Sequence, residues 1–472
     1  MTYLPPFRSA ARRLRPTLGA AFLGLGLITL SACSVVPLDD LPTRARVADS
    51  TLPPMKAFAA AHPEAPRRSN PNIAADFLAL HFELESGRKL DSFTRFETPV
   101  TVRVTGTPPA SLSPDLRRLL SRLRREAGID IHQVNRGAAN ITIEAVSREE
   151  IRSALPQAAC FVVPNVSSFD EFRRDRRKPK TSWSALRDRT RMGIFVPSDS
   201  TPQELRDCLH EELAQALGPL NDLYRLPDSV FNDDNVHTVL TGFDMLILRA
   251  TYAPELHSGM TEGQVAARLP AILSRLNPAG DRIAPTPVSL TPRGWIDAVQ
   301  TALGPNVPLP ARRGAAATAT QIARQQGWSD QRLAFSYYLQ GRILQLTDPA
   351  AAQAQFRAAE AVLDRNPDTQ LHKAQIVTQT AAYAIARGAP QQALAEIEPM
   401  LPLVQQSENA ALLATLMMLK AEALETMGET KQAEAIRLDS LGWARYGFGS
   451  DWAVRTKISE IAALNPNSRR QG

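Results

Sequence analysis

The sequence predicts an α/β (α+β) domain with a mixed sheet, followed by an all-α C-terminal domain built from helical repeats. Two observations predict this order. Between residues 73 and 276, short runs with strand-like alternation are interspersed with segments of helical periodicity, which is typical of a sheet covered by helices. From about residue 331 onward the pattern is almost entirely helical, and part of it recurs after 40 residues.

Residues 1–32 have the features of an export signal. Arginines precede an apolar run, Leu18 to Leu30, that is too short to span a bilayer as a permanent helix, and no acidic residue occurs before Cys33. The run ends in Leu30-Ser31-Ala32-Cys33, which resembles the bacterial lipobox. This resemblance implies cleavage before Cys33 and a membrane anchor of acyl chains, such as palmitate, on that residue. An ordinary signal peptide followed by a chance cysteine is the alternative.

The charge and the residue after the cysteine bear on location and partners. Ser34 follows Cys33, which in the lipoproteins that the motif resembles favours the outer membrane. We therefore expect a periplasm-facing lipoprotein of the cell envelope. Four of the positive charges in the net charge of +6 belong to arginines of the signal, so the rest of the chain carries about +2. The net charge therefore gives no argument for a nucleic-acid partner.

The chain has three cysteines. If Cys33 carries lipid, Cys160 and Cys208 remain as a pair in an oxidising compartment. We predict a disulfide between them, with two free buried thiols as the alternative.

The first domain has recognisable elements. Residues 33–72 are rich in Pro, Ala and small polar residues and are predicted to form a tether. In the domain of residues 73–276, a capping box with proline at N1 starts a helix at Thr201 that should end at Gly218, a natural C′ residue. The other predicted elements are strands at Phe96–Thr105, Ala139–Ala145, Ala159–Pro164 and Met192–Pro197 and a helix at Ser113–Ala127.

The remaining chain divides into a linker and helices. Residues 277–330 are Pro- and Ala-rich and are predicted to be a linker with one short helix near Gly294–Leu303. In residues 331–466, one set of small residues recurs at the same spacing: Ala381, Ala384, Gly388 and Ala393, then Ala421, Leu424, Gly428 and Ala433. This resembles tetratricopeptide-type repeats, which implies protein partners. A generic helical bundle is the alternative.

The most informative segment begins at Cys208. His210-Glu211 looks like the opening of a zinc motif H-E-x-x-H, but the second ligand position holds Ala214. One residue later, Glu211-Glu212-x-x-Gln215-x-x-Gly218-x-x-Asn221 has the spacing of the metzincin signature H-E-x-x-H-x-x-G-x-x-H. Glu212 takes the general-base position, and no ligand position holds histidine.

Two further stretches extend the resemblance. Ser229-Val230-Phe231-Asn232-Asp233 resembles the metzincin Met-turn, with Phe231 in place of methionine. Leu240-Thr241-x-x-Asp244, with Leu248 and Tyr252, resembles the closing helix of matrixin-type domains. The resemblance implies a degenerate zincin-like fold over about residues 75–260, with an active-site helix.

The segment is also similar to an uncharacterised family of proteobacterial lipoproteins with a domain of unknown function (DUF family 2927). That family carries E-E-x-x-Q-x-x-G-x-x-N-D just after a cysteine. The matching positions are Cys208, Glu211, Glu212, Gln215, Gly218, Asn221 and Asp222, followed by Ser229 to Asp233. The family lends no established reaction.

Three uses of these residues remain open. Glu211, Gln215, Asn221 and Asp222 are candidate ligands of an unusual divalent metal, because oxygen ligands suit Ca²⁺ or Mg²⁺ better than zinc. Glu212 is a candidate general base, and the chain would then be a metal-dependent peptidase or hydrolase. Alternatively, Glu211, Gln215 and Asn221 form a hydrogen-bonded polar cluster that needs no ion.

We favour a function without catalysis and expect no cofactor. The spacing of the metzincin signature is intact but its zinc ligands are missing, and helical repeats follow. This combination indicates a protein-binding scaffold. A third hypothesis assigns the basic run of residues 173–180 to anionic lipid or cell-wall polymer, although such runs are usually solvated loops.

Overall fold

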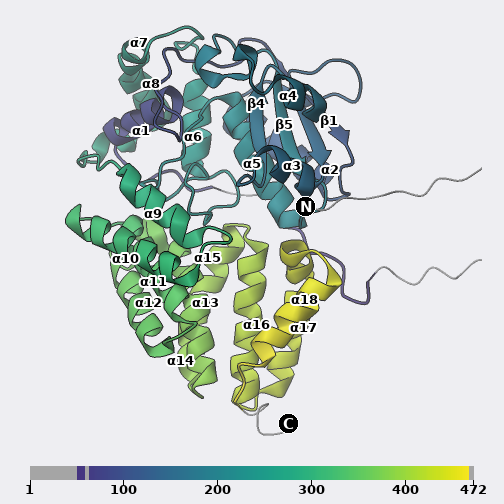
Figure 1. Cartoon of the computed structure of the whole chain (residues 1–472), viewed down its shortest axis with the longest axis vertical. Coiled ribbons are helices and arrows are strands. Elements are labelled where there is room, and N and C mark those ends of the chain that lie inside the picture. The colour runs from purple at the N-terminus through teal and green to yellow at the C-terminus, as the bar shows by residue number, and fades with distance from the viewer. Residues whose placement is uncertain (1–49, 59–62, 467–472) are drawn as a thin grey trace, which may run out of the picture. The chain divides into compact units, whose positions relative to one another are not determined.

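The computed structural model describes residues 50–58 and 63–466, so the predicted signal peptide and Cys33 lie outside the described residues. The described chain belongs to one unit that starts at Ser50. It begins with a mixed α/β region and continues as an all-helical region, which agrees with the predicted order (Figure 1).

A five-stranded sheet with strand order β2-β1-β3-β5-β4 forms the centre of the first region. The strands β1, β2, β3 and β5 are parallel neighbours, and only the edge strand β4 runs antiparallel, against β5. Four of the strands overlap the predicted ones, whereas β2 has three residues and no visible pattern. The strands are β1 (Val100–Gly106), β2 (Ile131–Gln133), β3 (Ile141–Val146), β4 (Phe161–Pro164) and β5 (Met192–Pro197).

Helices cover both faces of the sheet. On one face, α2 (Leu112–Glu126) and α5 (Pro202–Leu217) bury Leu119 and Leu209 against strand residues such as Ile143. On the other face, α3 (Arg148–Ala154) and α4 (Phe169–Asp175) enclose a smaller core around Phe195 (Figure 1). The side chains of β5 are therefore buried on both faces of the sheet, as its continuous apolar sequence indicates.

Further helices and short turns complete this region and contribute to the larger core. The helix α1 packs on α8, and α6 packs on α2 and α8. The elements are α1 (Asn70–Phe82), α6 (Gly242–Thr251), α7 (Glu262–Ala266) and α8 (Leu269–Leu276), with short 3₁₀ turns η2 (Pro179–Thr181), η3 (Trp183–Ala185) and η4 (Gly280–Arg282).

The segment predicted as a linker, 277–330, contains two helices. The predicted short helix is α9 (Arg293–Leu303), and α10 (Leu309–Gln325) follows it. Ala316, Ala319 and Ala323 of α10 pack against Trp295 of α9. The prediction of an irregular linker is therefore wrong for α10, whose alanines form the face that packs on α9.

The remaining chain consists of helices packed in sequence-adjacent pairs. For example, α11 packs on α12 and α16 packs on α17. Gly388 and Gly428 follow the ends of α13 and α16 with φ of 75° and 85°, so the two predicted equivalent glycines have the same left-handed role. The helices are α11 (Gln331–Leu344), α12 (Pro349–Leu363), α13 (Gln370–Ala386), α14 (Pro390–Ile397), α15 (Met400–Gln406), α16 (Ala410–Thr426), α17 (Thr430–Phe448) and α18 (Asp451–Ala462), and a 3₁₀ turn, η5 (Pro367–Thr369), precedes α13.

The segment predicted as a tether is partly packed. The backbone N–H of Lys56 donates to the carbonyl of Gly442, 3.1 Å away, and the ring of Phe58 stacks on Trp443 with centroids 4.5 Å apart. At its other end, α1 begins at Asn70, three residues before the predicted domain boundary. In the described residues, no helix combines the length and apolarity that crossing a membrane requires.

Candidate functional site

The motif helix α5 starts at the predicted N-cap, but the reciprocal half of the predicted capping box is not formed, because the carboxylate of Glu204 pairs with Arg148 at 2.8 Å. The side chain of Thr201 accepts a hydrogen bond from the backbone N–H of Glu204, at 3.1 Å, and Pro202 occupies the first turn. Cys208 of this helix forms the predicted disulfide with Cys160, which directly precedes β4. The disulfide therefore ties the motif helix to the edge of the sheet.

Gly218 ends α5 for a different reason from the one predicted. Its φ of −173° is extended backbone, so it is not the left-handed C′ residue that we expected. A Cβ atom at this position would lie 2.8 Å from Cγ2 of Thr251 and 3.1 Å from Nε2 of His81. The glycine thus permits the close approach of α5 to α6 and α1.

A buried arginine, Arg189, satisfies the end of the helix. Its guanidinium donates to the carbonyl oxygens of Gln215, Ala216 and Gly218, at 2.5, 2.8 and 2.5 Å. Burial lowers its pKa to about 10, and the positive charge faces the negative end of the helix dipole. Sequence reasoning missed Arg189, because nothing distinguishes it from its neighbouring arginines.

Two of the positions that align with zinc ligands, Glu211 and Asn221, have different surroundings. Asn221 donates its side-chain amide to the carbonyl of Ala79 in α1, at 3.1 Å. Glu211 faces the loop of residues 230–238, and no hydrogen bond of the described residues joins it to Gln215 or Asn221. Nor do three His, Cys, Asp or Glu side chains of residues 50–58 and 63–466 lie where they would hold one metal ion. These residues therefore do not fit a zinc centre.

Glu212, at the general-base position, lies inside the protein. Glu212 is 5% exposed, and one of its carboxyl oxygens, Oε2, has no hydrogen-bond partner among the described residues. Burial, together with the nearby carboxyl groups of Glu211 and Glu85, raises its pKa well above the ordinary value. The raised pKa favours the protonated carboxyl, whereas a general base must be ionised to accept a proton.

Glu212 is part of a larger acidic cluster, which we define as Glu85, Asp207, Glu211, Glu212, Asp222 and Asp233. Burial raises the pKa of Glu211 to about 8, with Asp233, Glu85 and Asp207 adding repulsion. It also raises the pKa of Asp207 to about 8 and that of Asp222 well above its usual range. The carboxyl groups of Asp222 and Glu85 influence each other, and Glu85 adds to the rise in the pKa of Asp222. Sequence reasoning did not include Glu85 or Asp207.

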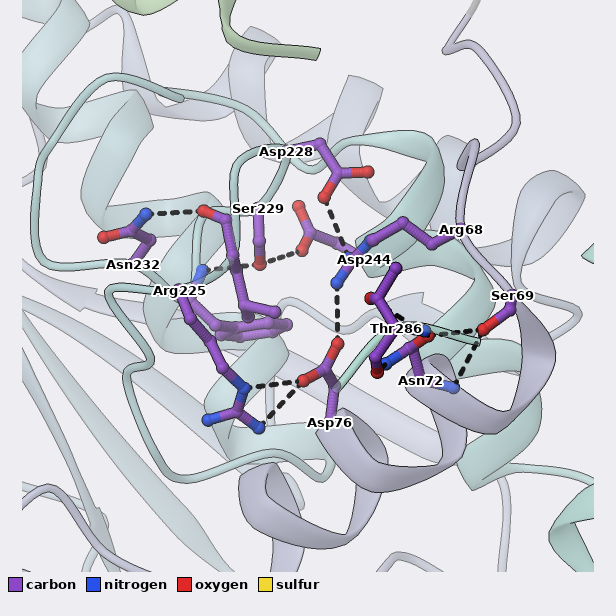
Figure 2. Close-up of polar contacts among 12 residues, drawn as sticks. Arg68, Ser69, Asn72, Asp76, Arg225, Asp228, Ser229, Asn232, Asp244 and Thr286 are labelled. Carbon is purple, nitrogen blue, oxygen red and sulfur yellow. Dashed lines mark hydrogen bonds and ion pairs between the residues drawn. The ribbon is translucent and has the colours of Figure 1, made fainter. Parts of the chain in front are cut away.

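Asp244 holds the turn of residues 229–233. Its carboxylate accepts from the hydroxyl of Ser229 at 2.5 Å and from the backbone N–H groups of Val230 and Thr241 at 3.2 and 2.8 Å (Figure 2). Phe231 is fully buried where a metzincin would place methionine, and the amide of Asn232 donates to the carbonyl of Leu226 at 2.5 Å. These contacts give the motif residues Ser229, Phe231 and Asn232 structural roles.

A network of ion pairs lies beside this turn. Arg68 donates to Asp76 and Asp228 at 2.6 and 2.8 Å, and Arg225 pairs with the other oxygen of Asp76 at 2.8 Å (Figure 2). All four side chains are largely buried. The network ties the residues before α1 to the loop that follows α5.

The histidines near the motif are structural or exposed. His210 accepts a hydrogen bond from the backbone N–H of Leu240 through Nδ1, at 3.1 Å, and burial holds its pKa well below the usual value. Nε2 of His237 lies 3.0 Å from the carbonyl of Pro227, and its pKa is also lowered by burial. His257 is exposed. None of them replaces a missing zinc ligand.

The basic run of residues 173–180 is partly neutralised. Lys178 and Lys180 pair with Asp175, each at 2.6 Å, and Lys180 also reaches Glu171 at 2.9 Å. The segment is thus less cationic than its sequence indicates.

Comparison with protein-family models finds a match over the first region. Residues 70–271 match the family model described as Protein of unknown function (DUF2927). The match includes the sheet, α5 and the turn that Asp244 holds. No curated protein and no solved structure matches the chain.

Proposed function

We propose that this chain is an envelope lipoprotein that binds a protein partner, and that its degenerate zincin-like domain serves as a scaffold instead of an enzyme. The proposal includes the lipid on Cys33, a periplasm-facing position at the outer membrane and tetratricopeptide-like repeats in the helical region. The mixed sheet with one antiparallel edge strand and the equivalent turns at Gly388 and Gly428 support the two fold assignments.

The state of Glu212 carries the argument against catalysis. A hydrolase that uses this helix needs an ionised base facing a reaction site. Glu212 is instead buried, with a pKa raised well above the ordinary value, and the side-chain amide of Asn221 is bonded to the carbonyl of Ala79. For the chain to act as a metal-dependent hydrolase, Glu212 would have to become exposed and ionised, and Asn221 would have to leave Ala79.

The packing of the two regions supports a scaffold. Gln203 of α5 bonds to Asn409 and to the backbone N–H of Ala411, at 3.0 and 2.8 Å, and the hydroxyl of Tyr446 donates to Asp115 of α2 at 2.6 Å. The helical region therefore packs directly on the helices that cover the sheet. A rigid pair of modules presents a preorganised binding surface, because little conformational freedom remains to be lost on binding.

A groove between the loop of residues 234–236 and the helical region is the best candidate for the binding surface. It has a volume of about 160 Å³ and is lined by α11, α13 and the loop of residues 234–236. Its apolar and aromatic lining includes Val236, Phe335, Tyr338 and Ile376. Such side chains contribute most of the binding energy in protein interfaces.

Two experiments test the proposal. A photo-crosslinking amino acid at Tyr338 should capture the same envelope protein repeatedly, whereas the same probe at exposed Glu434 should not capture it. In parallel, the full chain should cleave no peptides when divalent metals are supplied. Cleavage that Glu212→Gln abolishes would establish the hydrolase and end the scaffold proposal.

A further inference from the structure

A second, smaller pocket is bordered by the same loop as the groove. It has a volume of about 60 Å³ and is lined by three members of the acidic cluster, Asp207, Glu211 and Asp233. Thr238 also lines it: this residue is 7% exposed, and its hydroxyl oxygen has no hydrogen-bond partner. We call this the acidic pocket.

The acidic pocket lacks a matching positive charge. The nearest cation to Asp207 is Arg206, whose guanidinium lies 4.0 Å from one of its carboxyl oxygens but bonds more closely to Glu408, at 3.1 Å. Among the charged neighbours that influence Glu211 none is cationic, and Asp233 receives only the hydroxyl of Tyr224, at 3.4 Å. Burying several carboxyl groups without a counter-charge is costly, and it raises the pKa of Asp207 and Glu211 to about 8. A cation that enters the pocket can take the place of these protons.

The spacing of the side chains decides which cation fits. A calcium ion needs several oxygen atoms at about 2.3–2.6 Å from one point. No three acidic, histidine or cysteine side chains of the described chain are placed in this way. An ammonium group instead makes up to three separate hydrogen bonds of about 2.7–2.9 Å, so it tolerates carboxylates that stand further apart. It is also a more compact charge than a guanidinium, which suits the small volume.

The neighbouring groove determines what carries the ammonium group. Asn235 lines both the acidic pocket and the groove, so the two sites share a wall. We propose that the acidic pocket binds the lysine side chain of an extended peptide whose adjacent apolar side chain enters the groove. This inference rests on the proposed scaffold function and specifies the chemistry of its partner.

The first test changes the ligand and leaves the protein intact. The probe is a fluorescein-labelled hexapeptide with blocked ends and a central lysine–leucine pair, titrated with the full chain in detergent micelles. Fluorescence anisotropy should show saturable binding. A twin peptide with Nε-acetyl-lysine keeps the length of the side chain but removes its charge, and it should bind at least tenfold more weakly. Equal binding of the two peptides would overturn the proposal.

The second test changes the pocket. Glu211→Gln and Asp233→Asn should each lower the affinity for the lysine peptide at least tenfold. The affinity for the acetyl-lysine peptide should stay unchanged. Glu434→Gln removes an exposed carboxylate on α17 and is the matched control, with no change expected. If Asp233→Asn and Glu211→Gln leave the affinity for the lysine peptide unaltered, lysine does not occupy this pocket.

A calcium titration tests the competing occupant. If Ca²⁺ alone raises the melting temperature of the full chain and Glu211→Gln removes that shift, the pocket is a metal site and the lysine assignment is wrong. No shift with Ca²⁺ agrees with the proposal. Crosslinking through Tyr338 without any preference for lysine peptides would retain the scaffold function and refute only this inference.

Discussion

Arg206 of α5 donates to the carboxylate of Glu408 at 3.1 Å, and both side chains are buried where the α/β region meets the helical region. Arg206 also lies over the ring of Tyr446, 5.1 Å from its centroid. The pair joins the motif helix to the loop before α16.

We expect Arg206→Met to destabilise the chain by about 3–5 kcal/mol, because it leaves the carboxylate of Glu408 buried without a partner. The double variant with Glu408→Gln should recover part of this loss. Urea unfolding followed by circular dichroism measures both effects. A single variant as stable as the wild type would show that the pair does not hold the two regions together.

Gly218→Ala should destabilise the protein by about 1–3 kcal/mol, because the new Cβ would lie 2.8 Å from Cγ2 of Thr251. Thr251→Ser removes that methyl group and keeps the hydroxyl that lies 2.9 Å from Nε2 of His81. Combined with Gly218→Ala, it should therefore restore part of the lost stability, because the new Cβ would still lie 3.1 Å from Nε2 of His81. Thermal unfolding of the two single variants and the double variant decides whether this contact is the cause.

Asp244→Ala should destabilise the turn of residues 229–233 by roughly 2–4 kcal/mol, because it leaves the Ser229 hydroxyl and two backbone N–H groups without their acceptor. Asp91→Ala is a suitable control, since its side chain is 83% exposed. Chemical denaturation gives the difference in unfolding free energy. Equal effects of the two substitutions would contradict the structural role of Asp244.

Stability should fall as the pH rises from mildly acidic to mildly alkaline. The folded-state pKa values of Asp207 and Glu211 are about 8, above their unfolded values, mainly because of burial. The folded protein therefore holds these protons more tightly, and the stabilisation is lost as the pH rises through about 8. Both side chains retain some solvent contact, so each contribution is about 1–2 kcal/mol.

Urea unfolding at about pH 5.5 and about pH 8.5 measures this dependence. Asp207→Asn and Glu211→Gln should each flatten it, chiefly by raising stability at the higher pH. A dependence unchanged in both variants would show that other groups cause it.

The sequence predicted local helices and strands well, but it predicted contacts between residues far apart in the chain poorly. The strand at Met192–Pro197 and the start of α5 at Thr201 follow from apolar runs and capping residues, which act over a few positions. The metal-ligand interpretation of Asn221 depended on spacing alone. Its partner is the carbonyl of Ala79, 142 residues away, and a backbone carbonyl has no signature in a sequence.

The acidic cluster shows the same limit. Glu211, Glu212 and Asp222 stand out because they belong to one motif. Glu85 lies in a turn after α1, and only the fold brings it to Asp222. Helix α10 was missed because alanines that pack closely resemble the composition of a linker.

The segment of residues 50–58 joins the first described residues to the last helices. Besides the Lys56 and Phe58 contacts, Arg445 donates to the carbonyl of Pro53 at 2.9 Å, and Arg455 donates to the hydroxyl of Thr51 at 2.5 Å. A deletion of α17 and α18 would thus release the opposite end of the chain as well. Tension applied through residues 50–58 would therefore act directly on α17 and α18.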